Sequence, residues 1–327
     1  MSMDRRKFLK AGVAGLSGSF VLGGLSAGFP RNAQAANVVI DFTVEEVMKT
    51  VPINREILTW QYVNAFQAGP GALSSGIVVT EGDNVTINIR NNLTSNYPVN
   101  LIIPGLLETS AAVIPGGTQS YTFIASTPGS YLYYDDNNGQ LGRAMGLMGP
   151  LVVKPMDGSQ ALTPFESNPN IYDREYTIVT HEIDSRINDA VAAGLPFDLN
   201  NYQPDYFFAN GLSYPETVQD PAGNIDDTKV IFMSLGQNVA LRFINGGLIY
   251  YPMHFHGYHV NVVTRNRILE EYIVEKDTVL IKVGEAVDTI LAVGNQIGLY
   301  PLHTHYVPGV TTSGFYAGGG LLMLKAV

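Results

Sequence analysis

The chain has 327 residues, of which 46% are hydrophobic and 15% are charged, with 34 glycines and 18 prolines. This composition excludes a disordered protein and favours two compact domains built mainly from short strands joined by turns. Because the chain has no cysteine, it has no disulfide, no thiolate nucleophile and no cysteine-ligated metal, so a bound metal must use nitrogen and oxygen ligands.

Residues 1–35 have the order of a bacterial export signal. The pair Arg5-Arg6 is followed by Phe8 and Leu9, then by a glycine-rich apolar stretch that closes on Ala-Gln-Ala at Ala35. This segment resembles a twin-arginine signal peptide. We therefore predict cleavage after Ala35 and a periplasmic or extracellular location for the mature protein. An uncleaved amino-terminal anchor is the alternative interpretation.

Removal of this segment makes the chain strongly acidic. The whole sequence has 19 basic and 29 acidic residues, and residues 1–35 hold five of the basic residues and one of the acidic ones. The mature chain therefore has 14 basic and 28 acidic residues, a net charge of −14. Such a charge argues against nucleic acid or an anionic membrane as a partner and favours cations. No later apolar run reaches the roughly 20 residues that a membrane-spanning helix needs.

An internal repeat divides the rest of the chain into two similar halves. Each half has strand-like runs about every eight to twelve residues, the spacing expected of an antiparallel β-sandwich. Because the matching segments keep the same order, we predict one sandwich in each half. The matched segments are 82–91 with 236–245, 129–136 with 298–305, and 149–153 with 320–324.

The domain boundaries follow from composition. Residues 156–172 are rich in proline, serine, asparagine and glycine, which is typical of a linker between compact units. We therefore predict domain 1 over residues 36–155, the linker over 156–172 and domain 2 over 173–327. The segment 185–194 is predicted to form a short surface helix within domain 2.

Two His-x-His pairs are the main candidates for chemistry, namely His254 with His256 and His303 with His305. Residues i and i+2 of a strand project from the same face, so two facing strands would bring four imidazoles into one volume. Neutral imidazole ligates several transition metals, and the affinity order makes copper the first choice and zinc the second. The alternative is that these histidines are ordinary strand residues.

Other candidates are interpreted as structural or supporting residues. His259 lies three residues beyond His256, hence on the opposite strand face, and is predicted to support the ligands rather than bind metal directly. His181 stands alone in the sequence and is predicted to be structural. Met145 and Met148 are predicted to fill the core as part of the closing strands.

The sequence around the histidine pairs resembles the multicopper oxidase family, which includes laccases. Residues 251–257 and 303–305 are similar to the two histidine motifs of the family's last domain, and residues 205–211 and 146–151 resemble its strand signatures. The resemblance implies an all-β fold of two cupredoxin-like Greek-key β-sandwich domains in tandem. The two-domain size is similar to that of small laccases and copper nitrite reductases, which implies a homotrimer.

The chain departs from the family pattern at the type 1 copper ligands. Thr304 stands in the place of the cysteine, and Tyr251, Gly309 and Gly314 stand in the places of the other ligands. In the family, electrons enter at type 1 copper and pass along the cysteine to the cluster that reduces oxygen. The resemblance therefore implies that this chain has no type 1 copper and is not a conventional laccase.

Half of the family's remaining histidines are also replaced. In domain 1, Ile102 and Pro104 stand at one motif, and Tyr134 and Asp136 stand at the other. The resemblance leaves a half-site with His254 in a type 2 position and the other three histidines of the two pairs in type 3 positions. Asp136 of a neighbouring subunit is a candidate oxygen ligand or catalytic group, with a solvated turn as the alternative.

Three functions remain open at this point. The first is a copper-dependent oxidoreductase that acts on a small molecule at an open coordination position. The second is a copper-binding or buffering protein with a closed four-nitrogen site. The third is a non-catalytic scaffold of the cell envelope that retains the fold, against which the retention of all four histidines counts.

Overall fold

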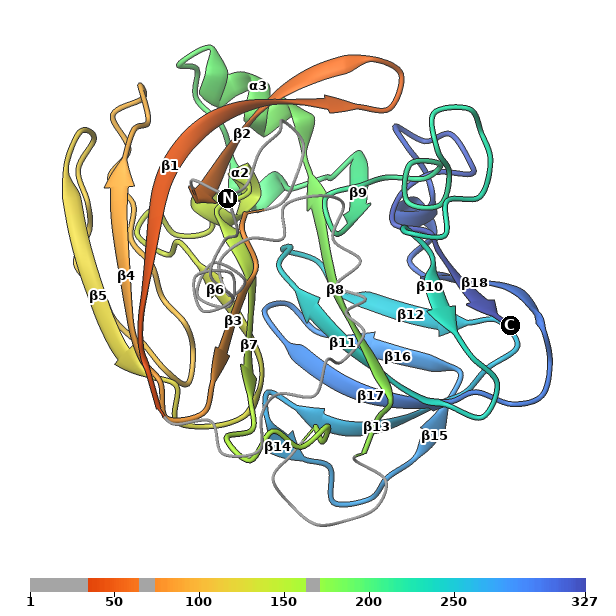
Figure 1. Ribbon diagram of the computed structural model, residues 1–327. Helices are drawn as coiled ribbons and strands as arrows, with labels where there is room; N and C mark the ends of the chain where they lie inside the picture. The colour runs from red at the N-terminus through yellow and green to blue at the C-terminus, as the bar shows by residue number, and fades with distance from the viewer. Residues whose placement is uncertain (1–34, 65–73, 163–170) are drawn as a thin grey trace, which may run out of the picture.

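The computed structural model describes residues 35–64, 74–162 and 171–327. The predicted export signal lies outside the described residues apart from Ala35, as does the part of the predicted linker at 163–170. Within the described ranges, no helix is long and apolar enough to cross a membrane. The fold is all-β, with two cupredoxin-like sandwiches that follow one another along the chain (Figure 1).

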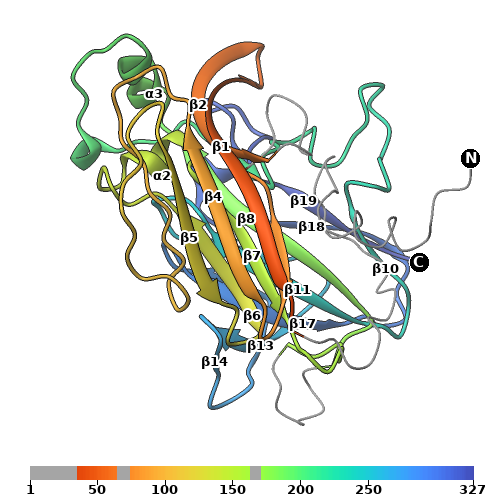
Figure 2. The same cartoon turned by 60° about the vertical axis from the view of Figure 1, so that its left-hand side comes forward.

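The first sandwich packs a four-stranded sheet on a three-stranded sheet. Its strands are β1 (Asn37–Val51), β2 (Arg55–Asn64), β3 (Ile77–Thr80), β4 (Asn84–Asn91), β5 (Thr118–Ile124), β6 (Gly129–Tyr134) and β7 (Met148–Lys154). The larger sheet has the order β2-β1-β4-β5 and the smaller has the order β3-β7-β6. β1 is parallel to β4 and β3 is parallel to β7, whereas the other pairs are antiparallel. Figure 2 shows β5, β4 and β1 side by side.

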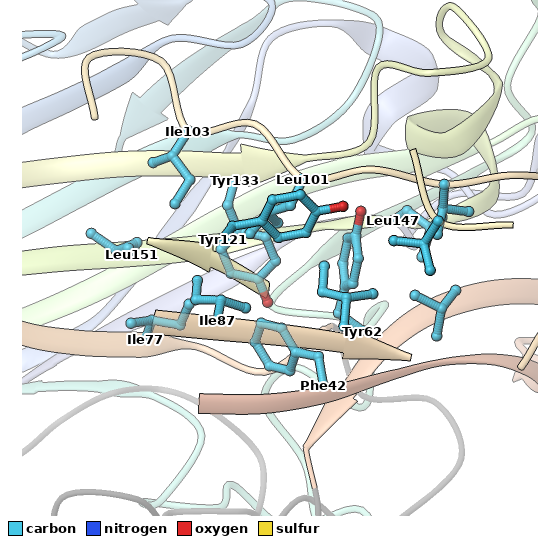
Figure 3. Packing of buried hydrophobic residues seen from close by; sticks show 14 of the residues in the cluster. Phe42, Tyr62, Ile77, Ile87, Leu101, Ile103, Tyr121, Tyr133, Leu147 and Leu151 are labelled. Carbon is cyan, nitrogen blue, oxygen red and sulfur yellow. The ribbon is translucent and has the colours of Figure 1, made fainter. Parts of the chain in front are cut away.

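The core of the first sandwich lies between its two sheets. Along β4, Val85, Ile87 and Ile89 are buried, and the residues between them are half-buried, as expected when one face of a strand meets the core. Figure 3 shows Tyr62, Tyr121 and Tyr133 in this core. The rings of Tyr62 and Tyr133 lie edge to face, with their centroids 5.7 Å apart. Each donates its hydroxyl to a backbone carbonyl oxygen, so neither buried phenol is left without a partner.

The second sandwich repeats this plan with more strands. Its strands are β8 (Arg174–Ile183), β9 (Tyr206–Ala209), β10 (Ile231–Met233), β11 (Asn238–Asn245), β12 (Tyr251–Phe255), β13 (Val260–Arg265), β14 (Ile268–Leu269), β15 (Glu275–Lys276), β16 (Thr278–Ile281), β17 (Ala286–Ala292), β18 (Gly298–Thr304) and β19 (Leu322–Ala326). One sheet has the order β10-β19-β18-β12-β16, and the other has β14-β13-β17-β11-β8-β9 with β15 on β13. β8 is parallel to β11, and β10 is parallel to β19.

The turns that precede β4 and β11 confirm the internal repeat. Gly82 and Gly236 occupy matching places before these strands, with φ of +85° and +80°. Glycine adopts this left-handed backbone without strain, whereas other residues rarely do. The two halves therefore share both their strand pattern and their turn conformation.

Short helices connect the strands. They are α2 (Leu141–Met145), α3 (Ser185–Ala192) and the 3-10 helices η2 (Leu199–Asn201) and η3 (Val307–Val310). α3 confirms the helix predicted within 185–194, and Asp184 caps it by accepting a hydrogen bond from the backbone N–H of Arg186. Met145 is fully buried as predicted, but it lies on α2 and not on a closing strand.

A buried polar cluster joins the two sandwiches. Arg242 on β11 is 1% exposed; its Nε lies 2.9 Å from Glu175, and its Nη1 lies 3.4 Å from Asp288. From the first sandwich, Ser130 donates a hydrogen bond of 2.5 Å to Asp288, and Lys154 pairs with Glu175. We call these five residues the interdomain ion network. It fixes the second sandwich, which carries the histidines, against the first.

Candidate metal centre

Four histidines gather on the outer face of the sheet that contains β12 and β18. His254 on β12 lies directly opposite His303 on β18. His256 and His305 lie two residues further along and project from the same face, whereas intervening residues such as Phe255 are buried in the core. The alternation of the two strands therefore brings together all four histidines that the sequence analysis selected.

The four rings lie close together. The ring centroid of His254 lies 4.8 Å from that of His256, 5.9 Å from that of His303 and 4.4 Å from that of His305. The centroid of His303 lies 5.1 Å from that of His256 and 5.6 Å from that of His305. His256 and His305 are exposed, whereas His254 and His303 are half-buried. The cluster is therefore open to solvent on one side.

Backbone carbonyl oxygens form hydrogen bonds with Nδ1 of His254 and of His303. Nδ1 of His254 lies 3.0 Å from the carbonyl oxygen of Asp277 and 3.1 Å from Oγ1 of Thr278. Nδ1 of His303 lies 3.0 Å from the carbonyl oxygen of Thr304. Because a carbonyl oxygen only accepts, Nδ1 of both rings carries the proton and Nε2 keeps its lone pair. Metal-binding histidines are typically oriented in this way.

The electrostatics of the cluster favour neutral imidazoles. Loss of solvation lowers the pKa of His256, and its neighbours His303, His254 and His305 lower it further. Loss of solvation also lowers the pKa of His305, again with help from His254 and His303, although Asp277 opposes the shift. Neutral imidazole is the form that ligates a metal.

Two of the four histidines are already spaced as ligands of one metal ion. Nε2 of His256 and Nε2 of His303 lie 2.9 Å apart, in a hydrogen bond that His256 donates because His303 carries its proton on Nδ1; a metal ion between the two atoms would replace that proton. Two nitrogens that each lie about 2.0–2.1 Å from one ion are about 2.9 Å apart when the bonds meet near a right angle. In the ranges that the structure describes, no three His, Asp or Glu side chains converge on one ion as they stand. His254 and His305 must therefore rotate about their side-chain torsions to join, between staggered rotamers.

Comparison with known proteins identifies the family. Residues 70–158 match one multicopper oxidase family model and residues 196–318 match another. The chain belongs to the multicopper oxidase family. The copper-containing nitrite reductase of Neisseria gonorrhoeae is 27% identical over 179 residues, which cover 52% of this chain and 41% of that protein. An iron transport multicopper oxidase of Epichloe festucae is 26% identical over 230 residues, covering 66% of this chain and 33% of that protein.

Solved structures of multicopper oxidases share the fold. The blue copper oxidase from Nitrosomonas europaea superposes with a TM-score of 0.72 at 24% identity, over 89% of this chain and 86% of that one. The copper nitrite reductase from the same organism gives a TM-score of 0.67 at 17% identity, over 89% and 94%. These similarities confirm the tandem cupredoxin fold. The named relatives are copper proteins, which supports copper and leaves zinc without support.

The remaining histidines of the chain lie outside the cluster. His259 is exposed between β12 and β13, and among the described residues it makes no ring contact with the four histidines. His181 is buried on β8, where its ring stacks on Phe208 at 4.8 Å. Burial, and then the charge of Lys49, lower the pKa of His181 well below its usual value. His181 is therefore a neutral core residue, as predicted.

Asp136 is held by Asn100, which lies 36 residues earlier in the chain. Its Oδ1 accepts a hydrogen bond of 2.6 Å from the side chain of Asn100, and its backbone N–H donates one of 2.9 Å back to the same side chain. Ile102 and Tyr134, which also replace family histidines, pair with each other through a β-bridge. Within one subunit, Asp136 therefore has a structural role in addition to any catalytic one.

Asp135, the neighbour of Asp136, is a buried carboxyl with a raised pKa. Burial raises the pKa of Asp135 to about 6, although the backbone N–H of Asn100 opposes the shift with a hydrogen bond of 2.7 Å. Its Oδ2 is buried and has no hydrogen-bond partner within the described residues. The ionised form of Asp135 is therefore costly in the folded state.

We expect Asp135→Asn to gain stability relative to the parent as pH rises from about 4 to 7. The pKa of Asp135 is about 6 in the folded protein and 3.8 ordinarily. Protonation of Asp135 therefore stabilises the parent fully below pH 3.8, and this stabilisation is lost as pH rises through about 6. At about 1.4 kcal/mol per pKa unit, the loss approaches about 3 kcal/mol. Urea unfolding at both ends of the range measures it, and a difference between the two proteins that does not vary with pH would contradict it.

Packing and hydrogen bonds fill the positions where the sequence resemblance places the type 1 ligands. The hydroxyl of Tyr251 donates to Glu182 at 2.6 Å. Thr304 is buried, and a Cβ added at Gly309 would lie 2.5 Å from Cγ2 of Thr304, which leaves no room there for an imidazole. The sequence analysis did not single out Glu182. In the sequence, Glu182 differs from its neighbours only as a carboxylate within the otherwise strand-like run 176–183.

Proposed function

We propose that this chain is an exported copper protein whose ion is held by His254, His256, His303 and His305, without a type 1 copper. The observation that carries the proposal is the approach of two Nε2 atoms, on His256 and His303, to 2.9 Å within a cluster of four rings. Membership of the multicopper oxidase family supports copper as the ion. A bound copper would supply one-electron redox chemistry.

The surroundings of the cluster favour an oxidoreductase that acts on a small molecule. His256 and His305 are exposed, so a small molecule has access to an ion held between the rings. Asp277 lies 3.9 Å from Nδ1 of His254 and adds negative charge that attracts a cation. The carbonyl oxygen of Thr304 accepts from Nδ1 of His303, which leaves the Nε2 lone pair of His303 free to bind an ion.

The same exposure supports a second candidate, a copper-binding or buffering protein. An ion at a surface site exchanges with solvent more readily than a buried one, as delivery or storage of copper requires. The two functions differ in whether the loaded protein converts a substrate. Nitrite, oxygen, peroxide and phenols are the small molecules to test, because the family's chemistry is redox chemistry.

We further propose that the protein is exported by the twin-arginine pathway and forms a homotrimer. Residues 1–35 support export. The open histidine face supports assembly, because domain 1 of a neighbouring subunit can cover it and bring Asp136 of that subunit to the ion. Light scattering on the mature chain measures the assembly, and a monomeric mass would contradict it.

Copper analysis and electron paramagnetic resonance of the copper-loaded mature chain test the proposed site. We expect stoichiometric copper and a type 2 signal in the parent, and loss of both in a His254→Ala, His303→Ala double variant. His259→Ala is the matched control, because it removes an exposed histidine outside the cluster and should keep both. Copper in the parent no higher than in the double variant would rule out both copper functions and leave a scaffold.

A further inference from the structure

A buried tyrosine and a buried carboxylate form a pair beside the histidine face. Tyr251 begins β12, three residues before His254, and its side chain is 2% exposed. Its hydroxyl donates a hydrogen bond of 2.6 Å to Oε2 of Glu182 on β8. Glu182 is also buried, so bulk water does not compete for this hydrogen bond.

Glu182 is held in a position to accept protons. Its carboxylate lies over Gly247, where a Cβ would meet Oε2 at 2.0 Å. Burial raises the pKa of Glu182, which makes it a stronger base than an exposed carboxylate, while the nearby charge of Arg143 opposes that shift. Four groups donate to it, namely the backbone N–H of Leu248 and of Ile249 and the hydroxyls of Tyr251 and Tyr202. Because the backbone donors cannot accept, they favour the ionised form.

Two further tyrosines lie next to the histidine face. Tyr306 follows His305 in the chain and is half-buried. The ring of Tyr306 lies 6.2 Å from that of Tyr250, centroid to centroid, and Tyr250 is 55% exposed. Tyr306 and Tyr250 therefore form a pair of rings that reaches solvent.

We propose that Tyr251 is a redox-active tyrosine and that Glu182 is its proton acceptor. When Tyr251 loses one electron to a high-potential one-electron oxidant, its O–H bond breaks and the proton moves along the hydrogen bond to Oε2 of Glu182. The products are a neutral phenoxyl radical, a protonated Glu182 and the oxidant reduced by one electron. The coupled proton transfer avoids a phenol cation, whose charge this buried position would not solvate.

This role stands on contacts that do not include the four histidines, so it is independent of the copper site. Tyr251 stands where the family has the first ligand of type 1 copper. The residue that replaces this ligand is thus itself able to hold a single oxidising equivalent. Thr304 and Gly309, at the places of two other ligands, have no such chemistry.

Flash oxidation of the mature chain with photogenerated tris(bipyridine)ruthenium(III) tests the role of Tyr251. Transient absorption and electron paramagnetic resonance follow the tyrosyl radical. We expect a long-lived radical in the parent and its loss in Tyr251→Phe. Tyr202→Phe removes the other phenol that donates to Glu182, at 3.3 Å, and should keep the long-lived radical. An unchanged long-lived radical in Tyr251→Phe would overturn the proposal.

Glu182→Gln tests the proton acceptor. Glutamine still accepts a hydrogen bond from Tyr251 but does not take up the proton, so we expect the long-lived radical to disappear and the solvent isotope effect on its formation to change. The same yield and decay as in the parent would reject Glu182 as the acceptor. Circular dichroism checks that each variant folds. If Glu182→Gln does not fold, the comparison of Tyr251→Phe with Tyr202→Phe decides the proposal.

Discussion

Arg242→Met is expected to lower the free energy of unfolding by about 3–5 kcal/mol, the usual cost of leaving one partner of a buried ion pair alone. Arg242 lies between Glu175 and Asp288, and Asp288 is itself buried. Methionine fills much of the same volume but leaves Asp288 without its guanidinium partner. Urea unfolding of the mature chain at neutral pH measures the loss.

Two further variants separate charge from packing. Arg242→Met combined with Asp288→Asn should recover part of the loss, because asparagine carries no charge and can accept from one of the hydroxyls of Ser130 and Thr264 while its NH2 group donates to the other. Lys325→Met removes a cation from a pair with Asp227 at 2.6 Å, whose side chains are 30% and 57% exposed. That surface variant should lower the free energy of unfolding by at most about 1 kcal/mol. Equal losses at Arg242 and Lys325 would contradict the network's role.

Gly247→Ala should also destabilise the protein strongly. The added methyl group would lie 2.0 Å from Oε2 of Glu182 and 2.6 Å from its Cδ, inside van der Waals contact. Overpacking costs about 1–3 kcal/mol. Displacement of the carboxylate also weakens its hydrogen bonds with Tyr251 and Leu248, at about 1.5–3 kcal/mol for a bond to a charged group. Thermal and urea unfolding measure the combined effect.

Gly294→Ala is the matched control for this variant. A Cβ at Gly294 meets no atom within 4 Å, and the residue is exposed. The same methyl group should therefore change stability there by only a few tenths of a kcal/mol, as for other surface substitutions. A Gly247→Ala protein as stable as Gly294→Ala would show that Glu182 moves aside without cost.

The sequence was sufficient to predict the strands and the histidine cluster. Alternation along each strand places His254 on one face with His256 and His303 on one face with His305, whereas the pairing of β12 with β18 that joins the two pairs is seen only in the structure. The repeat was likewise visible in the order of turns and strands. α2 was missed because five residues that include a glycine give too short a signal to predict a helix.

The sequence did not predict side-chain contacts between strands that are far apart in the chain. Tyr251 and Glu182 are 69 residues apart in the chain and meet only because β8 and β12 belong to the two sheets that face each other across the second sandwich. The proton positions on His254 and His303 were also not predictable, since they depend on which carbonyl oxygen each ring reaches. Such features require the packed arrangement of the sheets as well as their pattern.

The bonding around Asn100 and Asp136 affects how readily evolution can reverse the loss of metal ligands from the first half of the chain. The side chain of Asn100 donates to Oδ1 of Asp136 and accepts from its backbone N–H, and the backbones of Ile102 and Tyr134 form the adjacent bridge. A histidine at Asp136 would remove the hydrogen bond that Asn100 donates to Oδ1 before any metal ligand set was complete. That reversion therefore costs stability without yet restoring a metal site.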